Sequence, residues 1–238
     1  MHIAEGLLPA PYAIAYGLGA SIFVAAGIKS LATKTREIPM MKQLTGLMTA
    51  AVFLVSLLPI PVPITGTCSH PGGTPLSAIL LGPWITTLVS MIALLFQALF
   101  FAHGGLTTLG ANTLTMGVFG GFAGWLLFRG LQRAKVSLFW SGLVAGLVGD
   151  ILIYFGTSIQ LALAIHGQHP LGEVFWAIFG AFIPTQAPLA IVEGLFTGFV
   201  LKYIAEHRPD ILIMLKVIPA SVQGNTSHGL DLSPKGVD

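Results

Sequence analysis

The apolar positions of the chain fall into six long, nearly continuous stretches. Each contains about 20 or more predominantly apolar residues, which is enough for a helix to cross a bilayer. They cover approximately residues 8–28, 40–61, 83–102, 106–128, 138–165 and 174–203. This pattern predicts an all-α integral membrane protein.

A shorter apolar piece, residues 76–81, lies between the second and third stretches. It ends at Gly82-Pro83, where the missing proline amide favours a break in the helix. Lipid satisfies no backbone polar groups, so a short helix at membrane depth must lie inside protein or beside a cavity. We therefore expect about seven helices: six full spans and one short or re-entrant helix.

The composition agrees with a membrane protein. Hydrophobic residues make up 54% of the 238 residues and charged residues only 8%, against roughly 25% charged residues in soluble domains. We expect one polytopic membrane domain over residues 1–205 and a more polar cytoplasmic tail over 206–238. The net charge of +2 and the scattered basic residues argue against nucleic-acid binding.

Lysine and arginine occur in only three regions: residues 29–42, residues 129–135, and from residue 202 onward. The loops between them in the predicted order contain neither residue. The positive-inside rule places the basic segments in the cytoplasm, so both the N-terminus and the histidine-bearing loops should lie outside. The C-terminus should be cytoplasmic, in the plasma membrane of a prokaryotic cell. No basic segment precedes the first apolar stretch, so no cleavable signal is expected.

Small residues recur four positions apart in two of the last stretches. Gly142 with Gly146, and Gly194 with Gly198, would allow helix backbones to approach closely. Close helix packing is the simplest interpretation of these pairs.

Met1 and His2 form a potential metal chelate. The terminal amine, the His2 backbone nitrogen and the His2 imidazole would close a five-membered and a six-membered ring around one ion. A further imidazole would complete a square of nitrogens, which suits Ni(II) or Cu(II) and allows low-spin Co(II). The amide must lose its proton, so binding should weaken as the pH falls. The alternative is an ordinary exposed histidine at position 2.

His70 is the candidate for the fourth nitrogen. It lies in a Gly- and Pro-rich loop, residues 66–75, that leads into the short helix, and such a loop can line a cavity. An ordinary loop histidine is equally compatible with this position. We expect Cys68 to pack against the site or contact its ligands, and His103 to order its loop or contact the ligands rather than bind metal directly.

Other polar residues are candidates for supporting or transport roles. Glu5, Ser69 and Asn112 lie close in sequence to the histidine-bearing segments. Asp150 and Glu193 are acidic residues near or within spans, where charge is costly and often functional. They could instead bond neighbouring helix groups.

At these residues the chain resembles the CbiM/NikM family, the substrate-binding membrane subunits of energy-coupling-factor importers for cobalt and nickel. The resemblance extends from residue 1 to about 205. The segments that carry it are Met1-His2-Ile3 with Glu5-Gly6, Thr65-Gly66-Thr67-Cys68-Ser69-His70-Pro71, Leu81-Gly82-Pro83, residues 102–112, Gly149-Asp150, and residues 157–164 and 185–195.

The resemblance implies a seven-helix protein whose N-terminus inserts into the bundle. It implies that Met1, His2 and His70 bind the transported Co(II) or Ni(II), with a slight preference for cobalt. It also implies partners: a CbiQ/NikQ-like transmembrane coupling subunit, two CbiO/NikO-like ATPases and, in many members of the family, a small CbiN/NikN-like accessory membrane protein. The chain has no GxxxxGK[ST] motif, so we expect a transport subunit that is not an enzyme and relies on ATP hydrolysis by partners.

The chain departs from the family pattern at Ala4, where many relatives have Met, and over residues 72–77 beside His70. Two other functional classes remain open. An ATPase-independent channel or secondary carrier would use Asp150 and Glu193 as coupling groups. An intramembrane metalloenzyme is disfavoured because the sequence has no HExxH motif.

Overall fold

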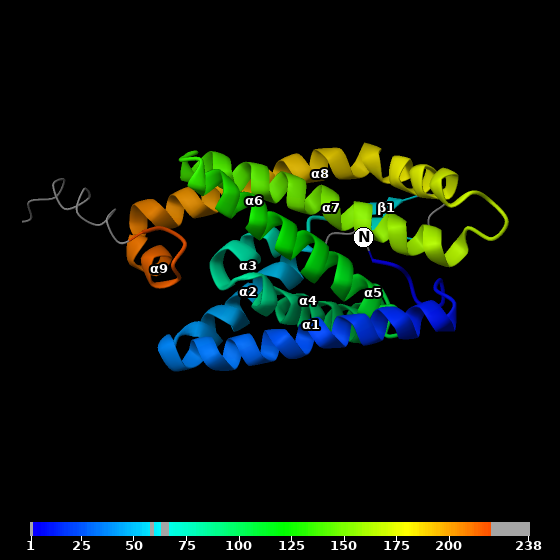
Figure 1. Ribbon diagram of the computed structural model, residues 1–238, viewed down its shortest axis with the longest axis horizontal. Helices are drawn as coiled ribbons and strands as arrows, with labels where there is room; N and C mark the ends of the chain where they lie inside the picture. Colours follow the sequence, from blue (N-terminus) through cyan, green and yellow to red (C-terminus); the bar gives the residue numbers. More distant parts are fainter. Residues whose placement is uncertain (1, 58–59, 63–66, 220–238) are drawn as a thin grey trace, which may run out of the picture.

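The long helices of the protein lie side by side along the long axis of a computed structural model, which describes residues 2–57, 60–62 and 67–219 (Figure 1). Within this part of the chain, five helices are long and apolar enough to cross a membrane. They are α1 (Ala10–Glu37), α4 (Pro83–Phe101), α7 (Leu138–Ile165), α8 (Leu171–His207) and a continuous helix made of α5 (Leu109–Thr113), the π-helical η1 (Leu114–Gly120) and α6 (Gly121–Arg133).

The second apolar stretch forms a shorter helix than expected. Helix α2 covers Met41–Val55, 15 residues, or about 22 Å, against the roughly 30 Å thickness of the hydrocarbon core. Strand β1 (Ile60–Val62) then pairs antiparallel with β2 (Thr67–Ser69). The expectation of a full span over residues 40–61 is not met, because strand pairing takes the last residues of that stretch.

The short helix before Gly82 is present as α3 (Thr74–Leu81), and every residue in it is buried. Gly82 ends it with φ of +91°, a conformation open to glycine. Pro83 then begins α4, a position where the absent amide costs no hydrogen bond. The structure confirms both the short buried helix and the break.

The glycine pairs bring α7 and α8 together. A Cβ atom on Gly142 would lie 3.1 Å from the Cα of Gly198, and one on Gly146 would lie 3.0 Å from the Cα of Gly194. The predicted close helix packing is confirmed, and it fixes the two helices that support the loop containing His70.

The chain continues as helix past the expected domain boundary. Helix α8 ends at His207, and α9 (Pro209–Met214) packs against it with Leu212 fully buried. The division at 205/206 therefore falls inside α8 and stays a prediction. Residues 220–238 lie outside the described part of the chain.

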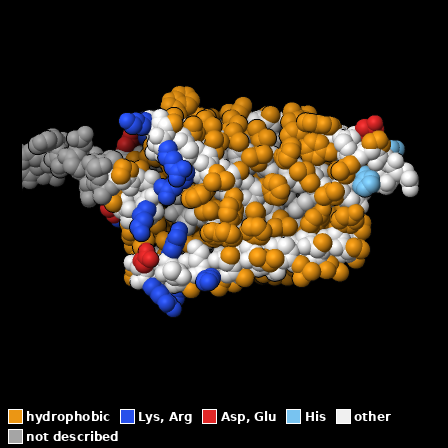
Figure 2. Space-filling model, in the orientation of Figure 1, with side chains coloured by type: hydrophobic (Ala, Val, Ile, Leu, Met, Phe, Trp, Pro, Cys, Tyr) orange, Lys and Arg blue, Asp and Glu red, His pale blue; other side chains and the backbone are white. Residues whose placement is uncertain are grey.

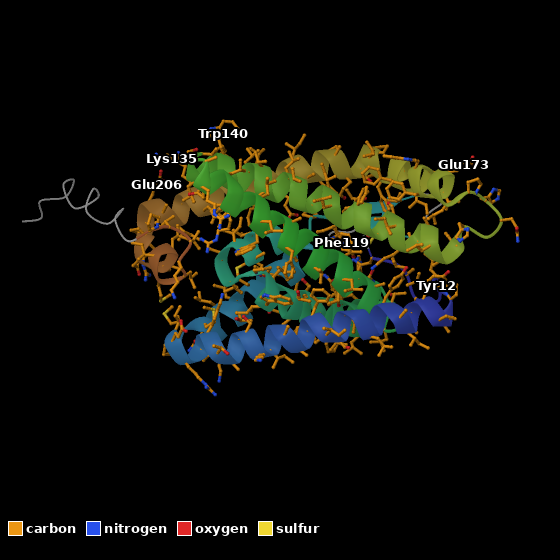
Figure 3. All side chains as sticks on the ribbon, in the orientation of Figure 1. Tyr12, Phe119, Lys135, Trp140, Glu173 and Glu206 are labelled. Atoms are coloured by element: carbon orange, nitrogen blue, oxygen red, sulfur yellow. The ribbon has the colours of Figure 1, made fainter. Side chains whose placement is uncertain are left out.

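The two ends of the bundle differ in charge. Hydrophobic side chains cover the middle of the molecule, whereas lysine and arginine gather at one end (Figure 2). Lys135 and Glu206 lie at this basic end, and Tyr12 and Glu173 at the other (Figure 3). This distribution is the one expected for a bundle that crosses a bilayer with its basic end in the cytoplasm.

Candidate metal site

The segment before α1 folds back into the bundle (Figure 1). We call residues 2–9 the N-terminal strap. His2 is 2% exposed and Ile3 is fully buried. The Ile3 backbone N–H donates to Asn112 Oδ1 at 2.9 Å, its carbonyl accepts from Thr108 Oγ1 at 2.8 Å, and Ile3 forms an antiparallel bridge with Thr67. The inward course of the strap is thus confirmed from His2 onward, whereas Met1 lies outside the described residues.

Glu5 holds the exposed part of the strap. Its carboxylate accepts hydrogen bonds from the Thr107 hydroxyl at 2.5 Å and from the Thr107 backbone N–H at 3.2 Å. The hydroxyl hydrogen bond lowers the pKa of Glu5, because it favours the charged form. Glu5 therefore ties the strap to the segment after His103 and does not itself reach the histidines.

The second part of the site is the His70 loop, residues 69–73, which is anchored on α7 and α8. Tyr154 Oη accepts the His70 N–H at 2.8 Å and donates to the His70 carbonyl at 3.0 Å. The Glu193 carboxyl group accepts the N–H groups of Gly72 at 2.5 Å and Gly73 at 2.8 Å. These buried contacts hold the backbone of His70 from both sides.

Further polar groups of α7 and α8 complete this support. The Ser69 and Thr185 hydroxyls lie 2.7 Å apart, and the Gln186 amide donates to Asp150. Asp150 and Glu193 are both buried. The structure thus joins Ser69, in the His70 loop, to α8, and it places the two intramembrane acids beneath the loop.

Strap and loop bring four side chains together. The ligand atoms of His2, Cys68, His70 and His103 all lie within 4.8 Å of one another. His2 Nδ1 is at the centre, 2.6 Å from His70 Nε2, 2.8 Å from His103 Nε2 and 3.9 Å from Cys68 Sγ. Such a convergence of imidazole and thiol groups can hold a transition-metal ion.

The chemistry of His70 leaves Nε2 free for a metal. Its Nδ1 lies 2.8 Å from the Pro71 carbonyl, which can only accept, so Nδ1 carries the proton and Nε2 has the lone pair. Burial lowers the pKa of His70 well below its ordinary value, and burial followed by repulsion from His70 does the same for the pKa of His2. Both rings are therefore neutral near pH 7, as metal ligation requires.

His103 and Cys68 lie beside His2 in this cluster. Besides its contact with His2, His103 Nε2 lies 3.4 Å from Cys68 Sγ. Burial opposes the thiolate, but other interactions, which include the hydrogen bond with His103, lower the pKa of Cys68 to about 7. The indirect roles expected for both residues stay predictions: their ligand atoms lie in the cluster and contact His2, a position that fits either support or direct binding.

Three further supporting residues were not selected from the sequence as site candidates: Tyr154, Thr185 and Gln97. Gln97 is fully buried, donates to Ser56 Oγ at 2.7 Å, and interacts with the His2 side chain. All three lie within apolar stretches, where they read as ordinary span residues. A polar or amphipathic side chain inside a predicted span was the only available hint.

Comparison with known proteins identifies relatives over nearly the whole chain. A family model described as "CbiM: Cobalt uptake substrate-specific transmembrane region" matches residues 2–211. The cobalt transport protein CbiM of Sorangium cellulosum is 44% identical over 92% of this chain and 97% of its own length. That of Geobacter sulfurreducens is also 44% identical, over 94% of this chain, and the chain spans 65% of its length.

Two solved structures are similar in fold to this chain. The chain matches a truncated transition metal transporter with a TM-score of 0.73 and 28% identity, covering 87% of this chain and 99% of the other. A second transition metal transporter gives a TM-score of 0.68 and 26% identity, with 87% and 93% covered.

Proposed function

Since the chain belongs to the CbiM family and is a multi-pass membrane protein, we propose that it is the substrate-capture subunit of an ATP-driven energy-coupling-factor importer. The transported ion is Co(II), with Ni(II) as the alternative. The relatives are named cobalt transport proteins, which supports cobalt, whereas a plane of nitrogen ligands also suits Ni(II).

In this proposal the ion is bound by the Met1 amine, the His2 backbone nitrogen, the His2 imidazole and His70. The observation that carries it is the 2.6 Å separation of His2 Nδ1 and His70 Nε2 inside the bundle. Nδ1 is the imidazole nitrogen that can close a six-membered ring with the backbone nitrogen of the same residue. His103 Nε2 and Cys68 Sγ lie beside these atoms and would contact the bound ion or its ligands.

The charge distribution supports an orientation for capture. On the face that Figure 2 shows, lysines and arginines gather at the end that the positive-inside rule assigns to the cytoplasm. The sequence segments that carry His2, His70 and His103, residues 2–9, 66–75 and 102–112, contain no lysine or arginine, which favours a divalent ion there. The chain has no phosphate-binding loop, so in this proposal two partner ATPases supply the energy for release. A transmembrane coupling subunit links them to the chain, and a small accessory membrane protein is a further partner.

The chelate is tested by blocking the terminal amine. A short Gly/Ser extension ahead of Met1 converts the amine into an amide, and the same extension after Asp238 serves as the control. Co(II) and Ni(II) binding to the purified protein is measured by calorimetry and by metal content. The N-terminal extension should abolish tight binding and the C-terminal one should not. Equal affinity in the two proteins would exclude the terminal chelate.

The dependence on ATPase partners needs a separate measurement. Uptake of radioactive cobalt is compared in cells whose partner ATPases are active or carry an inactivating substitution. We expect uptake only with active ATPases. Unchanged uptake would instead indicate a channel or secondary carrier.

A further inference from the structure

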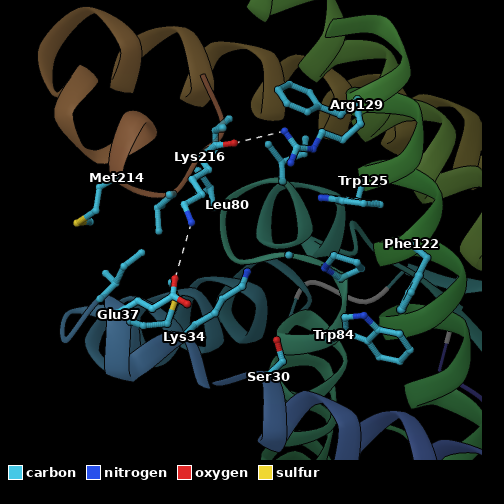
Figure 4. Close-up of a pocket in the computed structure, with 18 residues that line it drawn as sticks. Ser30, Lys34, Glu37, Leu80, Trp84, Phe122, Trp125, Arg129, Met214 and Lys216 are labelled. Atoms are coloured by element: carbon cyan, nitrogen blue, oxygen red, sulfur yellow. Dashed lines mark hydrogen bonds and ion pairs between the residues drawn. The ribbon is translucent and has the colours of Figure 1, made fainter. Parts of the chain in front are cut away.

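A pocket of about 370 Å³ lies at the basic end of the bundle (Figure 4). Its walls come from the end of α1, the junction of α3 and α4, helix α6 and the segment after α9. None of its lining residues belongs to the metal cluster. The pocket is therefore separate from the metal cluster, and any ligand it binds is distinct from the transported ion.

Three cations and one carboxylate line this pocket: Lys34, Arg129, Lys216 and Glu37. Glu37 pairs with Lys216 at 3.7 Å through exposed side chains. Within residues 2–57, 60–62 and 67–219, neither Lys34 nor Arg129 forms a salt bridge. The pocket thus holds an excess of positive charge.

Backbone carbonyls hold two of these cations. Lys34 Nζ donates to the Leu81 carbonyl at 2.7 Å, and Arg129 Nη1 donates to the Lys216 carbonyl at 3.3 Å. A Cβ atom at Gly82 would lie 2.9 Å from Lys34 Nζ, so the glycine leaves room for the ammonium group. Neutral acceptors position the cations without cancelling their charge, and each cation keeps further N–H donors.

One wall of the pocket is aromatic. Trp84 and Phe122 pack edge to face with ring centroids 4.9 Å apart, and the Arg129 guanidinium lies over Trp125 at 5.7 Å. Tryptophan is enriched where a membrane protein meets the interface between hydrocarbon and water. The pocket therefore combines cations with tryptophans, the residue types expected where a membrane protein meets lipid headgroups.

An apolar cleft of about 350 Å³ adjoins this pocket, between α2, α3 and α8. It shares the lining residues Leu80 and Leu215 with the basic pocket, and all the residues that line it are apolar or glycine. A ligand with a charged group and a hydrocarbon chain fits this pair of cavities better than a small soluble anion does.

We propose that the basic pocket binds a phosphate group, carried by the headgroup of an acidic phospholipid. Arginine and lysine donors suit phosphate oxygens. Basic pockets between membrane helices on the cytoplasmic side bind such headgroups, whose negative charge is attracted by each nearby cation. The bound lipid would join α1, α3, α6 and the segment after α9, and it would stabilise the end of the bundle opposite the metal cluster.

The test uses the full chain in mixed micelles that contain either phosphatidylglycerol or phosphatidylcholine. Native mass spectrometry counts the lipids retained by each protein. The pocket variant is Lys34→Gln/Arg129→Gln/Lys216→Gln. The matched control, Lys42→Gln/Lys135→Gln/Lys202→Gln, removes three exposed cations that do not line this pocket.

The native chain should retain phosphatidylglycerol in preference to phosphatidylcholine. The pocket variant should bind it more weakly by roughly fivefold for each cation removed, and the control should bind as the native chain does. Equal losses in the two variants would show a general charge effect and overturn the proposal, as would failure of the native chain to retain the acidic lipid.

Two further measurements make the result decisive. Unchanged Co(II) binding shows that the pocket variant is folded. If this variant does not fold, the single substitution Arg129→Gln, on the exposed face of α6, is used in its place. Inorganic phosphate is titrated in micelles without phospholipid. Binding of phosphate that depends on the pocket cations, without retention of phosphatidylglycerol, would overturn the lipid as the source. Because metal binding is measured separately, failure of this proposal and failure of the metal-capture proposal are distinguishable.

Discussion

The strap and the His70 loop each bring a histidine to the same cluster, but different parts of the bundle hold them. The loop is bound by Tyr154 and Glu193, both buried, from α7 and α8. The strap is bound by side chains of residues 107–112 and by the backbone bridge between Ile3 and Thr67, and its outermost contact, between Glu5 and Thr107, is exposed. The loop is therefore anchored by buried contacts within the bundle, whereas the outer end of the strap is held by a contact at its surface.

In the proposed function, this difference lets the site be stable and still release its ion. A metal held between two segments is freed when the segments part. The outer contact of the strap is exposed to water, whereas the contacts of the loop with Tyr154 and Glu193 are buried, so we expect the strap to be the part that moves. Substitutions under the loop should then reduce the stability of the protein, and substitutions under the strap should mainly change the rate at which metal leaves.

The largest effect is expected for Glu193→Ala. It leaves the buried N–H groups of Gly72 and Gly73 without acceptors, at about 1–3 kcal/mol each. Thermal unfolding in detergent should show the loss. Glu206→Ala, which removes an exposed carboxylate from the same helix, is the control. A melting temperature that is equally high in both variants would mean that the carboxyl group does not anchor the loop.

Tyr154→Phe should have the next largest effect. The hydroxyl bonds both the N–H and the carbonyl of His70, so its removal loosens the backbone that positions Nε2. Loss of a group that orients a metal ligand typically weakens binding by about 10–100-fold. Calorimetric titration with Co(II) measures this, with the exposed Tyr203→Phe as the control. Native affinity in the Tyr154 variant would contradict the role of the hydroxyl.

Asn112→Ala tests the inner anchor of the strap. Its amide bonds both backbone groups of Ile3, but Thr108 continues to bond the carbonyl, so stability should fall by only about 1 kcal/mol. Metal dissociation, followed by stopped-flow chelation, should accelerate. Thr113→Val on the same helix serves as the control. If Asn112→Ala lowers the stability of the protein as much as Glu193→Ala does, the strap is anchored in the bundle as firmly as the loop.

The smallest effect is expected for Glu5→Gln. The uncharged amide keeps an acceptor for Thr107, and the contact is exposed to water. The dissociation rate should rise by less than about threefold, since exposed charge interactions contribute little. The same stopped-flow measurement of the metal dissociation rate tests this expectation. A tenfold change would place the control of release at the outer end of the strap.

The sequence singled out the side chains that meet in the candidate site, and what it did not predict has specific physical reasons. His2 and His70 could be selected because one is adjacent to the terminal amine and the other lies in a loop between apolar stretches. Tyr154 and Glu193 contact that loop across 84 and 120 or more residues, so nothing near them in the chain reveals their partners. The length of α2 was overestimated because the hydropathy of an apolar stretch does not show whether its last residues complete a helix or enter a strand.

Four features follow from the sequence alone: the membrane class, the break at Gly82, the basic end of the bundle and the potential chelate at Met1 and His2. These are properties of short segments: hydropathy, charge, the geometry of glycine and proline, and atoms joined by covalent bonds. Folding was needed to show that the strap turns inward, that His103 and Cys68 join the two other histidines, and that α7 and α8 hold the loop. Those arrangements depend on packing between distant segments, which the pattern within any one segment does not specify.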